Sequence, residues 1–260
     1  MGILNRIWKI IVRFYHRCAS PPHFYQIAGT MLPWCAALTI ILFIVGVTWG
    51  LVFAPSEKQQ GEVYRIIYIH VPAASLSMMS YVFVAIASAI GMVWRMKMAQ
   101  IVAVSAIPIG TALTLVALIT GAIWGKPTWG RYWLWTDPRM LLMFIMFLLF
   151  IGLIVINNAI EDKTTAANAT AILSIAGVVT VPMIYLSVNP AFQKVFGRTI
   201  HQGQTQMFNK SQMTPEIAHA LLVMIFAFML YFVTALLLRI RNEILVREQN
   251  AAWVKEKVLS

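Results

Sequence analysis

The sequence predicts an all-α fold: a polytopic membrane protein of six transmembrane helices that forms a single integral membrane domain over residues 1–260. Two observations lead there. Of the 260 residues 60% are hydrophobic and only 11% are charged, whereas soluble domains carry roughly 25% charged residues. The charges also avoid six stretches, each near the ~20 apolar residues that cross a hydrocarbon core of about 30 Å. Helices are then favoured, because a backbone in lipid must satisfy its own hydrogen bonds.

Each predicted span occupies one charge-free run. The spans are expected near 31–53, 69–94, 101–123, 140–158, 166–188 and 217–238. Before the last span, Thr214, Pro215 and Glu216 form a typical helix start, with a cap, a proline and an acid. Pro108 and Pro182 lie inside spans and are expected to kink them.

Six spans place both termini on one side of the membrane. The positive-inside rule predicts that side to be cytoplasmic, because the basic residues gather in the two tails and in the loop at 95–100. Three longer segments, 54–68, 124–139 and 189–216, then share the outer face. The net charge of +11 lies in tails and short loops, where it suits membrane lipid headgroups, so no nucleic acid partner is predicted.

The sequence limits the chemistry that the chain could perform. It has no P-loop, so it cannot power transport with ATP by itself. Its two cysteines, Cys18 and Cys35, form no CxxC or CxxCH motif, which excludes covalent haem attachment at such a site.

The segment WGKPTWGRYWLWTDP, residues 124–138, holds four tryptophans. A lipid-interface belt, a packed core and a platform for a flat aromatic ligand are the three interpretations. Its glycines and Pro127 disfavour a long helix before residue 130, and residues 130–136 are predicted to form a short one. Such a helix would be aromatic on two sides, with Trp133 on one and Trp135 on the other. A belt needs only its lipid-facing side, so the platform is favoured.

Two of the five histidines lie on the predicted outer face. His16 and His23 belong to the basic tail, and His219 is expected to make a buried polar contact. His70 ends the second span on its outer side, and His201 lies in the third outer segment. Each alone favours a structural hydrogen bond, but as a pair they are typical of haem iron held from both sides. The same segments offer aromatic faces from Trp129, Trp133 and Trp135, and cations for two propionates from Arg65, Arg131, Arg139 and Arg198.

At these residues the chain resembles the CcmC family of haem-handling membrane subunits, called haem exporter protein C, from the cytochrome c maturation system. The resemblance covers most of the chain in order. It is carried by PPHFYQIAG, FAPSEKQQGEVYRIIYIHVPAA, WRMKMAQ, PIG, WGKPTWGRYWLW, HQGQT and RIRNEILV.

The resemblance implies that His70 and His201 are the axial ligands of a non-covalent haem b. It implies that a tryptophan-rich platform touches the haem, formed by Trp124, Trp129, Gly130, Trp133 and Trp135. Arg65 and Arg139 match arginines of the family. The family's aspartate directly follows the last tryptophan, whereas here Thr136 stands between Trp135 and Asp137. One residue turns a helical side chain by about 100°, so the sequence alone does not give Asp137 the family aspartate's role.

The function that the resemblance implies is carriage without catalysis. The chain would bind haem on the periplasmic face of the bacterial inner membrane and deliver it to a membrane-tethered haem chaperone. An ABC transporter ATPase, a second membrane subunit and a small single-span subunit are the implied partners. One alternative is a haem-free permease or scaffold subunit of an ABC-type export complex. The other is a quinol-oxidising cytochrome b, which would place its haem ligands well inside the spans.

Overall fold

The structure is a computed structural model that describes residue 8 and residues 19–201 and 213–258. All named elements of this part of the chain are helices, as predicted. In order they are α2 (Pro21–Thr48), the π-helical turn η1 (Trp49–Phe53), the 3-10 turn η2 (Glu62–Ile66), α3 (Ile67–Val93), α4 (Lys97–Trp129), α5 (Pro138–Ala159), α6 (Lys163–Gly177), α7 (Thr180–Leu186), α8 (Pro190–Phe196), α10 (Pro215–Arg247) and α11 (Ala252–Val258). Outside the described residues lie His16, Cys18 and the rest of HQGQT after His201.

Six spans are confirmed, because among the described residues six helices are long and apolar enough to cross a membrane. Their ends differ from the prediction where a helix continues past the apolar run. The first starts at Pro21 rather than 31, and the last continues to Arg247 rather than ending at 238. Hydrophobicity marks where a helix meets lipid, but hydrogen bonding and capping decide where it stops.

The fifth span is interrupted. Its two parts, α6 and α7, meet at Val178 and Val179. Pro182 explains the position of the break, because proline has no N–H to donate and its ring clashes with the carbonyl four residues earlier, that of Val178. The expected kink at Pro182 is thus confirmed as a break.

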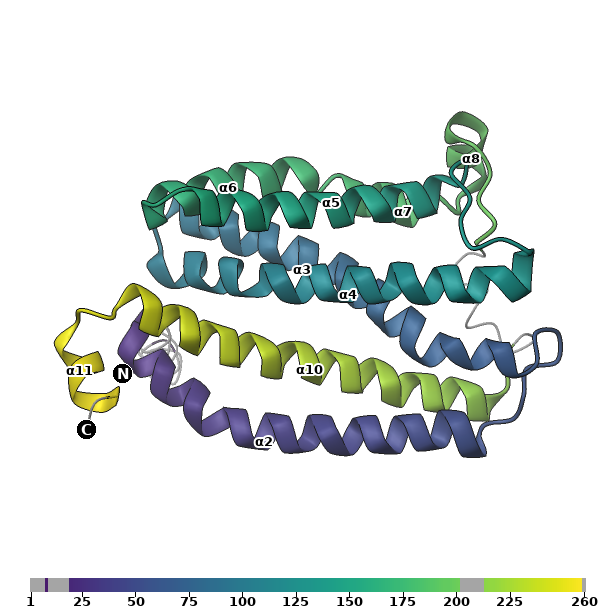
Figure 1. Cartoon of the computed structure of the whole chain (residues 1–260), viewed down its shortest axis with the longest axis horizontal. Coiled ribbons are helices and arrows are strands. Elements are labelled where there is room, and N and C mark those ends of the chain that lie inside the picture. Colours follow the sequence, from purple (N-terminus) through teal and green to yellow (C-terminus); the bar gives the residue numbers. More distant parts are fainter. Residues whose placement is uncertain (1–7, 9–18, 202–212, 259–260) are drawn as a thin grey trace.

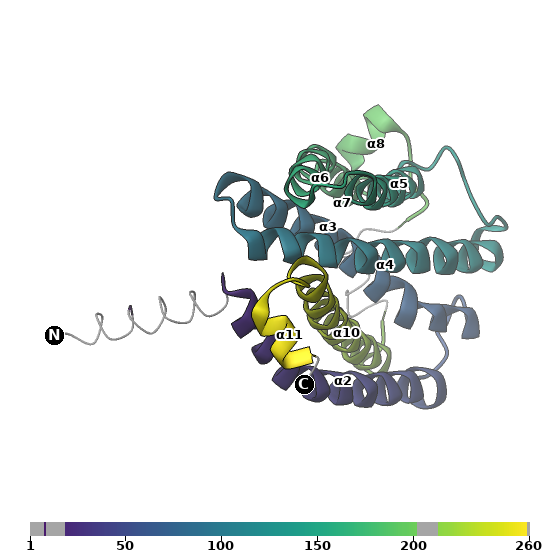
Figure 2. The same cartoon turned by 60° about the vertical axis from the view of Figure 1, so that its left-hand side comes forward.

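The helices stack in three layers (Figure 1). Helices α5, α6 and α7 form one outer layer, α3 and α4 the middle, and α2 and α10 the other outer layer, an arrangement that the rotated view repeats (Figure 2). The middle layer carries much of the core, since α3 and α4 each contribute more buried residues than any other described helix. Close approach depends on small residues: a Cβ at Gly110 would meet Phe150, and one at Gly177 would meet Tyr81.

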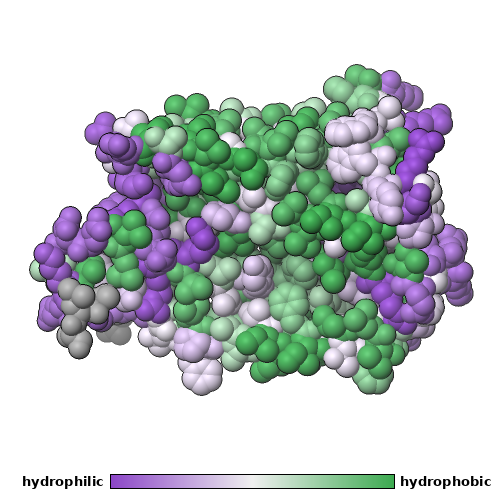
Figure 3. Space-filling view, in the orientation of Figure 1, coloured by the Kyte–Doolittle hydropathy of each residue, from purple (hydrophilic) through white to green (hydrophobic). Residues whose placement is uncertain are grey.

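Hydrophobic side chains cover the middle of the bundle and hydrophilic ones gather toward its two ends (Figure 3). This banding is what a bilayer requires of a spanning protein. We call one end the terminal end: it carries α11 and the turns at 94–96 and 160–162, and Lys97 pairs there with Glu248 at 2.8 Å. The opposite end, here called the cavity end, carries residues 54–66, 130–137 and 187–201 (Figure 1).

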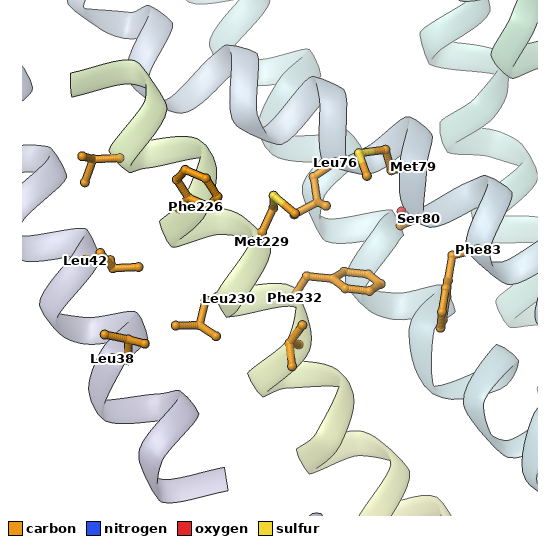
Figure 4. A pocket seen from close by; sticks show the side chains of 12 residues that line it. Leu38, Leu42, Leu76, Met79, Ser80, Phe83, Phe226, Met229, Leu230 and Phe232 are labelled. Atoms are coloured by element: carbon orange, nitrogen blue, oxygen red, sulfur yellow. The ribbon is translucent and has the colours of Figure 1, made fainter. Parts of the chain in front are cut away.

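A lipid-facing hollow, here called the groove, runs between α2, α3 and α10 (Figure 4). Its volume is about 590 Å³. Its lining is apolar apart from Ser80, whose hydroxyl donates to the carbonyl of Ser77 at 2.7 Å. The side chains that line it include Leu38, Leu42, Met79, Phe83, Phe226 and Met229.

Candidate functional site

A second hollow, here called the cavity, opens at the cavity end and holds both predicted ligand histidines. His70 comes from α3 and His201 from the segment after α8, and side chains of α4, α5 and α10 complete the wall. Its volume is about 270 Å³, just under the ~300–1,000 Å³ of pockets that enclose small organic ligands. A ligand as large as a porphyrin would therefore stand partly outside it.

His70 is fixed by α4. Its Nδ1 atom lies 3.1 Å from the hydroxyl of Thr120, and its ring stands edge-on to Trp124 with centroids 5.6 Å apart. Gly121 makes room for it, because a Cβ there would lie 2.9 Å from Cε1 of the imidazole. The absence of a side chain at Gly121 thus gives the His70 ring its place between α3 and α4.

His201 is held by the last residue of α4, by a neighbour in its own segment and by the N-cap residue of α5. Its ring centroid lies 5.6 Å from that of Trp129, and its Nδ1 atom is 3.2 Å from the hydroxyl of Thr199. The carboxylate of Asp137 is 3.7 Å from the same nitrogen, which is an electrostatic contact rather than a hydrogen bond.

Asp137 is fully buried and joins two segments. As the N-cap of α5, its Oδ1 accepts from the backbone N–H groups of Arg139 at 2.9 Å and Met140 at 3.0 Å. Its Oδ2 accepts from the Thr199 hydroxyl and from the Ile200 N–H, both at 2.8 Å.

The neighbours of Asp137 keep its carboxyl ionised. Its burial raises the pKa of Asp137, but the His201 imidazole and the backbone N–H groups of Ile200 and Met140 outweigh burial and lower that pKa to about 2. The residue displaced by Thr136 therefore contacts Thr199, Ile200 and His201 from outside the cavity lining. The Asp-Pro pair before a span was its sequence signal, as an N-cap followed by proline at N1.

Three tryptophans line the cavity: Trp124, Trp129 and Trp133. Trp124 is oriented by its Nε1–H, which donates to Oε1 of Gln60 at 2.7 Å. The Nε1 atom of Trp133 is buried with no hydrogen-bond partner among the described residues, so it is a donor that a ligand could use. Trp135 lies outside the cavity, 67% exposed, and packs against Trp133 with ring centroids 5.6 Å apart.

The predicted short helix over 130–136 is wrong. Helix α4 continues through Gly125 and Pro127 to Trp129, and Gly130 ends it in the left-handed conformation with φ 76°. Pro127 removes only one hydrogen bond, near the end of the helix, and the Thr128 side-chain hydroxyl donates to the Trp124 carbonyl at 2.8 Å. Trp124 and Trp129 thus come from α4 itself, and Trp133 from the irregular segment that follows.

Only one of the four predicted arginines lines the cavity, namely Arg139. Its Nη1 donates to the carbonyl of Ile184 in α7 at 3.2 Å. Arg65 is engaged elsewhere: it pairs with Glu62 and donates to the carbonyls of Gly50 and Ala54, which anchors η1. Arg131 and Arg198 are exposed outside the cavity.

The remaining described histidines lie outside the cavity. His23 is exposed, as predicted for the tail. His219 is also exposed, on α10 near Trp49, with ring centroids 6.3 Å apart. The expected buried polar contact of His219 is therefore wrong.

The donor set fits an iron that is already held by a porphyrin. No group of three or more His, Cys, Asp or Glu that could hold a metal ion occurs among the described residues, so a bare tetrahedral ion would lack ligands. Two imidazoles suffice for haem, because the macrocycle fills the other positions. The cavity also offers a porphyrin indole rings, the thioethers of Met78, Met140 and Met143, and the guanidinium of Arg139.

Sequence similarity to known proteins assigns the chain to a family. The family model described as "Heme exporter protein C" matches residues 14–255. The chain is similar to heme exporter protein C of Escherichia coli K12, at 41% identity over 97% of this chain and 98% of that protein. It is 38% identical to the protein of that name from Haemophilus influenzae, over 96% and 97% of the two chains. For Rhodobacter capsulatus the identity is 37%, over 92% and 97%.

Matches of this length and identity agree with the motifs around both histidines and the tryptophans. The chain belongs to the heme exporter protein C family.

Proposed function

We propose that the cavity binds haem b non-covalently and that the protein delivers it to a membrane-tethered haem chaperone during c-type cytochrome maturation. Family membership supports haem handling in cytochrome c maturation. The observation that carries the proposal is that His70 and His201, 131 positions apart in the chain numbering, line one cavity together with three tryptophans. When bound, haem would accept nitrogen ligands from His70 and His201 and would supply no further chemistry, so the protein's task would be to hold and release it.

Arg139 is the propionate partner that we favour among the four candidates. It is the one that lines the cavity, and one of its nitrogens is fixed on Ile184, which leaves the remainder of the guanidinium for a carboxylate. Arg65 acts as an anchor for η1, and Arg131 and Arg198 lie on the outer surface.

The exposed aromatic residues of the segment 130–137, at the cavity end, suit the release of haem to a partner protein. Trp135 is 67% exposed and Tyr132 59% exposed, and both belong to the segment whose other side forms the cavity wall. Aromatic side chains with a free face are typical anchors of protein interfaces. We assign Trp135 to contact with the chaperone rather than to the haem.

The setting that we propose is the bacterial inner membrane, with the cavity end periplasmic and both termini cytoplasmic. The basic residues of the terminal end and its tails support this orientation through the positive-inside rule. We propose that an ABC transporter ATPase, a second membrane subunit and a small single-span subunit work with the chain, because no P-loop is present in the sequence.

Haem content tests the binding half of the proposal. The protein is purified in detergent, and its visible absorption is compared for wild type, His70→Ala, His201→Ala and the double variant. We expect haem in the wild type and its loss in the double variant. His219→Ala is the matched control, because that exposed histidine lies outside the cavity. Haem at wild-type occupancy in the double variant would overturn the ligand assignment.

Crosslinking tests delivery and separates it from the alternative of a haem-free permease or scaffold. A photoreactive residue at Trp135 should capture the haem chaperone in cells, and one at Trp34 on the lipid-facing side of α2, 77% exposed, should not. Equal capture at both positions would contradict a chaperone surface at the mouth.

A further inference from the structure

Both cavity histidines use the same kind of neighbour. The Nδ1 atom of His70 faces the hydroxyl of Thr120 at 3.1 Å, and that of His201 faces the hydroxyl of Thr199 at 3.2 Å. A hydroxyl carries one hydrogen and can also accept. What each threonine does with its own hydrogen therefore decides which imidazole nitrogen holds a proton.

Thr120 has already donated its hydrogen. Its Oγ1 lies 2.6 Å from the carbonyl of Val116, one turn earlier in α4, and a carbonyl can only accept. The Thr120 oxygen must then accept from His70, which puts the imidazole hydrogen on Nδ1. In a neutral imidazole the other nitrogen, Nε2, is then the one with a free lone pair.

Thr199 also donates its hydrogen, but its acceptor is a charged group. Its Oγ1 donates to Oδ2 of Asp137 at 2.8 Å, and the carboxylate accepts at both oxygens from four donors in total. The Thr199 oxygen accepts from Nδ1 of His201, so Nε2 of this ring also keeps its lone pair.

The two arrangements differ in what stands behind the hydroxyl. Behind His70 it is a neutral carbonyl, and behind His201 it is a fully buried carboxylate. A charged acceptor polarises the hydroxyl more strongly than a neutral one. The Thr199 oxygen then attracts the Nδ1 hydrogen more strongly, which raises the electron density at Nε2.

We propose that Thr120 and Thr199 are positioning residues that hold both histidines with Nε2 free to bind iron, and that Asp137, acting through Thr199, makes His201 the more strongly donating ligand. The inference rests on the proposed haem site. It adds two positioning residues and a difference in donor strength between the two histidines. Neither threonine bears a sequence signal, because the partner of each is defined only by the fold.

Haem titration of purified apoprotein in detergent tests the positioning role. Thr120→Val and Thr199→Val keep the shape and remove the hydroxyl, and each should weaken haem binding about 10–100-fold, the usual effect of losing an outer partner of a metal ligand. Thr120→Ser and Thr199→Ser should restore it. Thr111→Val is the matched control, since Thr111 makes the same bond to the carbonyl four residues earlier in α4 but lies outside the cavity.

A double-variant cycle separates positioning from general damage to the fold. If Thr199 acts through His201, then Thr199→Val should have no further effect on haem affinity in a His201→Gly background supplied with free imidazole, because free imidazole chooses its own tautomer. The Thr120→Val change should still act in that background. An equal loss from Thr199→Val with and without His201 would overturn the positioning role.

The proposed difference in donor strength between His70 and His201 can be measured separately, through the reduction potential of bound haem. A less donating ligand stabilises ferric iron less, so both Thr→Val changes should raise the potential, with Thr199→Val raising it more. Equal shifts would refute the role of Asp137 while leaving both threonines in place. Wild-type protein that binds no haem refutes the proposed function itself. Wild-type protein that binds haem, with both valine variants unchanged, refutes only this inference.

Discussion

Helices α3 and α10 separate the cavity from the groove, and both hollows use side chains of these two helices. The cavity nevertheless contains polar and charged groups, whereas the groove is almost entirely apolar. The groove is the larger, at about 590 Å³ against about 270 Å³. It faces lipid, and its single polar group, the Ser80 hydroxyl, is already bonded to the Ser77 carbonyl of its own helix. The cavity gathers imidazoles, indoles and a guanidinium from segments far apart in the chain.

Adjacent residues divide the two hollows. Met78 of α3 lines the cavity and Met79 the groove, and on α10 Ile225 lines the cavity and Phe226 the groove. A step of one residue turns a helical side chain by about 100°, so α3 and α10 each contribute side chains to both the cavity and the groove. The comparison teaches that convergence of polar groups, rather than size, marks the functional hollow, because lipid chains solvate an apolar groove without any specific partner.

The largest expected effect is on folding at the cavity. Asp137→Ala removes a helix cap, worth about 1 kcal/mol, and leaves buried donors unpaired at about 1–3 kcal/mol each. We expect a loss on the order of 2–4 kcal/mol, measured by thermal unfolding in detergent. Ser80→Ala in the groove removes one bond within its own helix and should cost about 1 kcal/mol or less. Equal losses from the two changes would contradict the contrast.

The second-largest expected effect comes from displacing the His70 ring. Gly121→Ala places a Cβ 2.9 Å from the imidazole Cε1, which must move the ring, so haem affinity should fall by about tenfold or more. Gly152→Ala on α5 is the control, because its Cβ would meet Leu173 at an ordinary 3.4 Å. Haem titration of both variants checks this, and unchanged affinity in Gly121→Ala would mean that His70 is not a ligand in this orientation.

The propionate assignment predicts a smaller effect. Arg139→Gln removes the cation of the cavity and should weaken haem binding by about tenfold, since a hydrogen bond to a charged group contributes roughly 1.5–3 kcal/mol. The exposed Arg131 should tolerate Arg131→Gln with less than about a twofold change. A stronger effect at Arg131 than at Arg139 would move the propionate site to the outer surface.

Substitutions on the groove side of the shared wall should have the least effect on haem. Phe226→Ala and Met79→Ala change lipid-facing side chains that are 53% and 56% exposed, and haem affinity should stay within about twofold, because neither side chain lines the cavity. Haem titration of these variants gives the baseline for the others. A tenfold loss here would show that the groove takes part in binding.

The sequence was sufficient for the six helices because lipid imposes a strong and simple rule on composition. It was insufficient for their ends. The polar turns Pro21–Thr30 extend α2 beyond the apolar run, and α4 passes through Gly125 and Pro127. Local breaker residues alone did not show that Trp124 and Trp129 would gain more from packing along one helix than from a turn.

For the site, the sequence pointed to the histidines and the tryptophans because those residue types are rare and chemically specific. It gave no weight to Thr120 or Thr199, whose significance depends on partners 50 and 62 positions away. Asp137 was discounted because Thr136 shifts it from the family's spacing. Its role follows from capping α5 and from reaching Ile200 across space, which no local pattern displays.

The central claim is that His70 and His201 together bind one haem iron in the cavity. The most direct measurement is the electron paramagnetic resonance spectrum of the purified protein loaded with ferric haem. We predict a low-spin signal with two imidazole ligands in the wild type, and conversion to a high-spin signal in both His70→Ala and His201→Ala. A low-spin signal that persists unchanged in either single variant would contradict the claim.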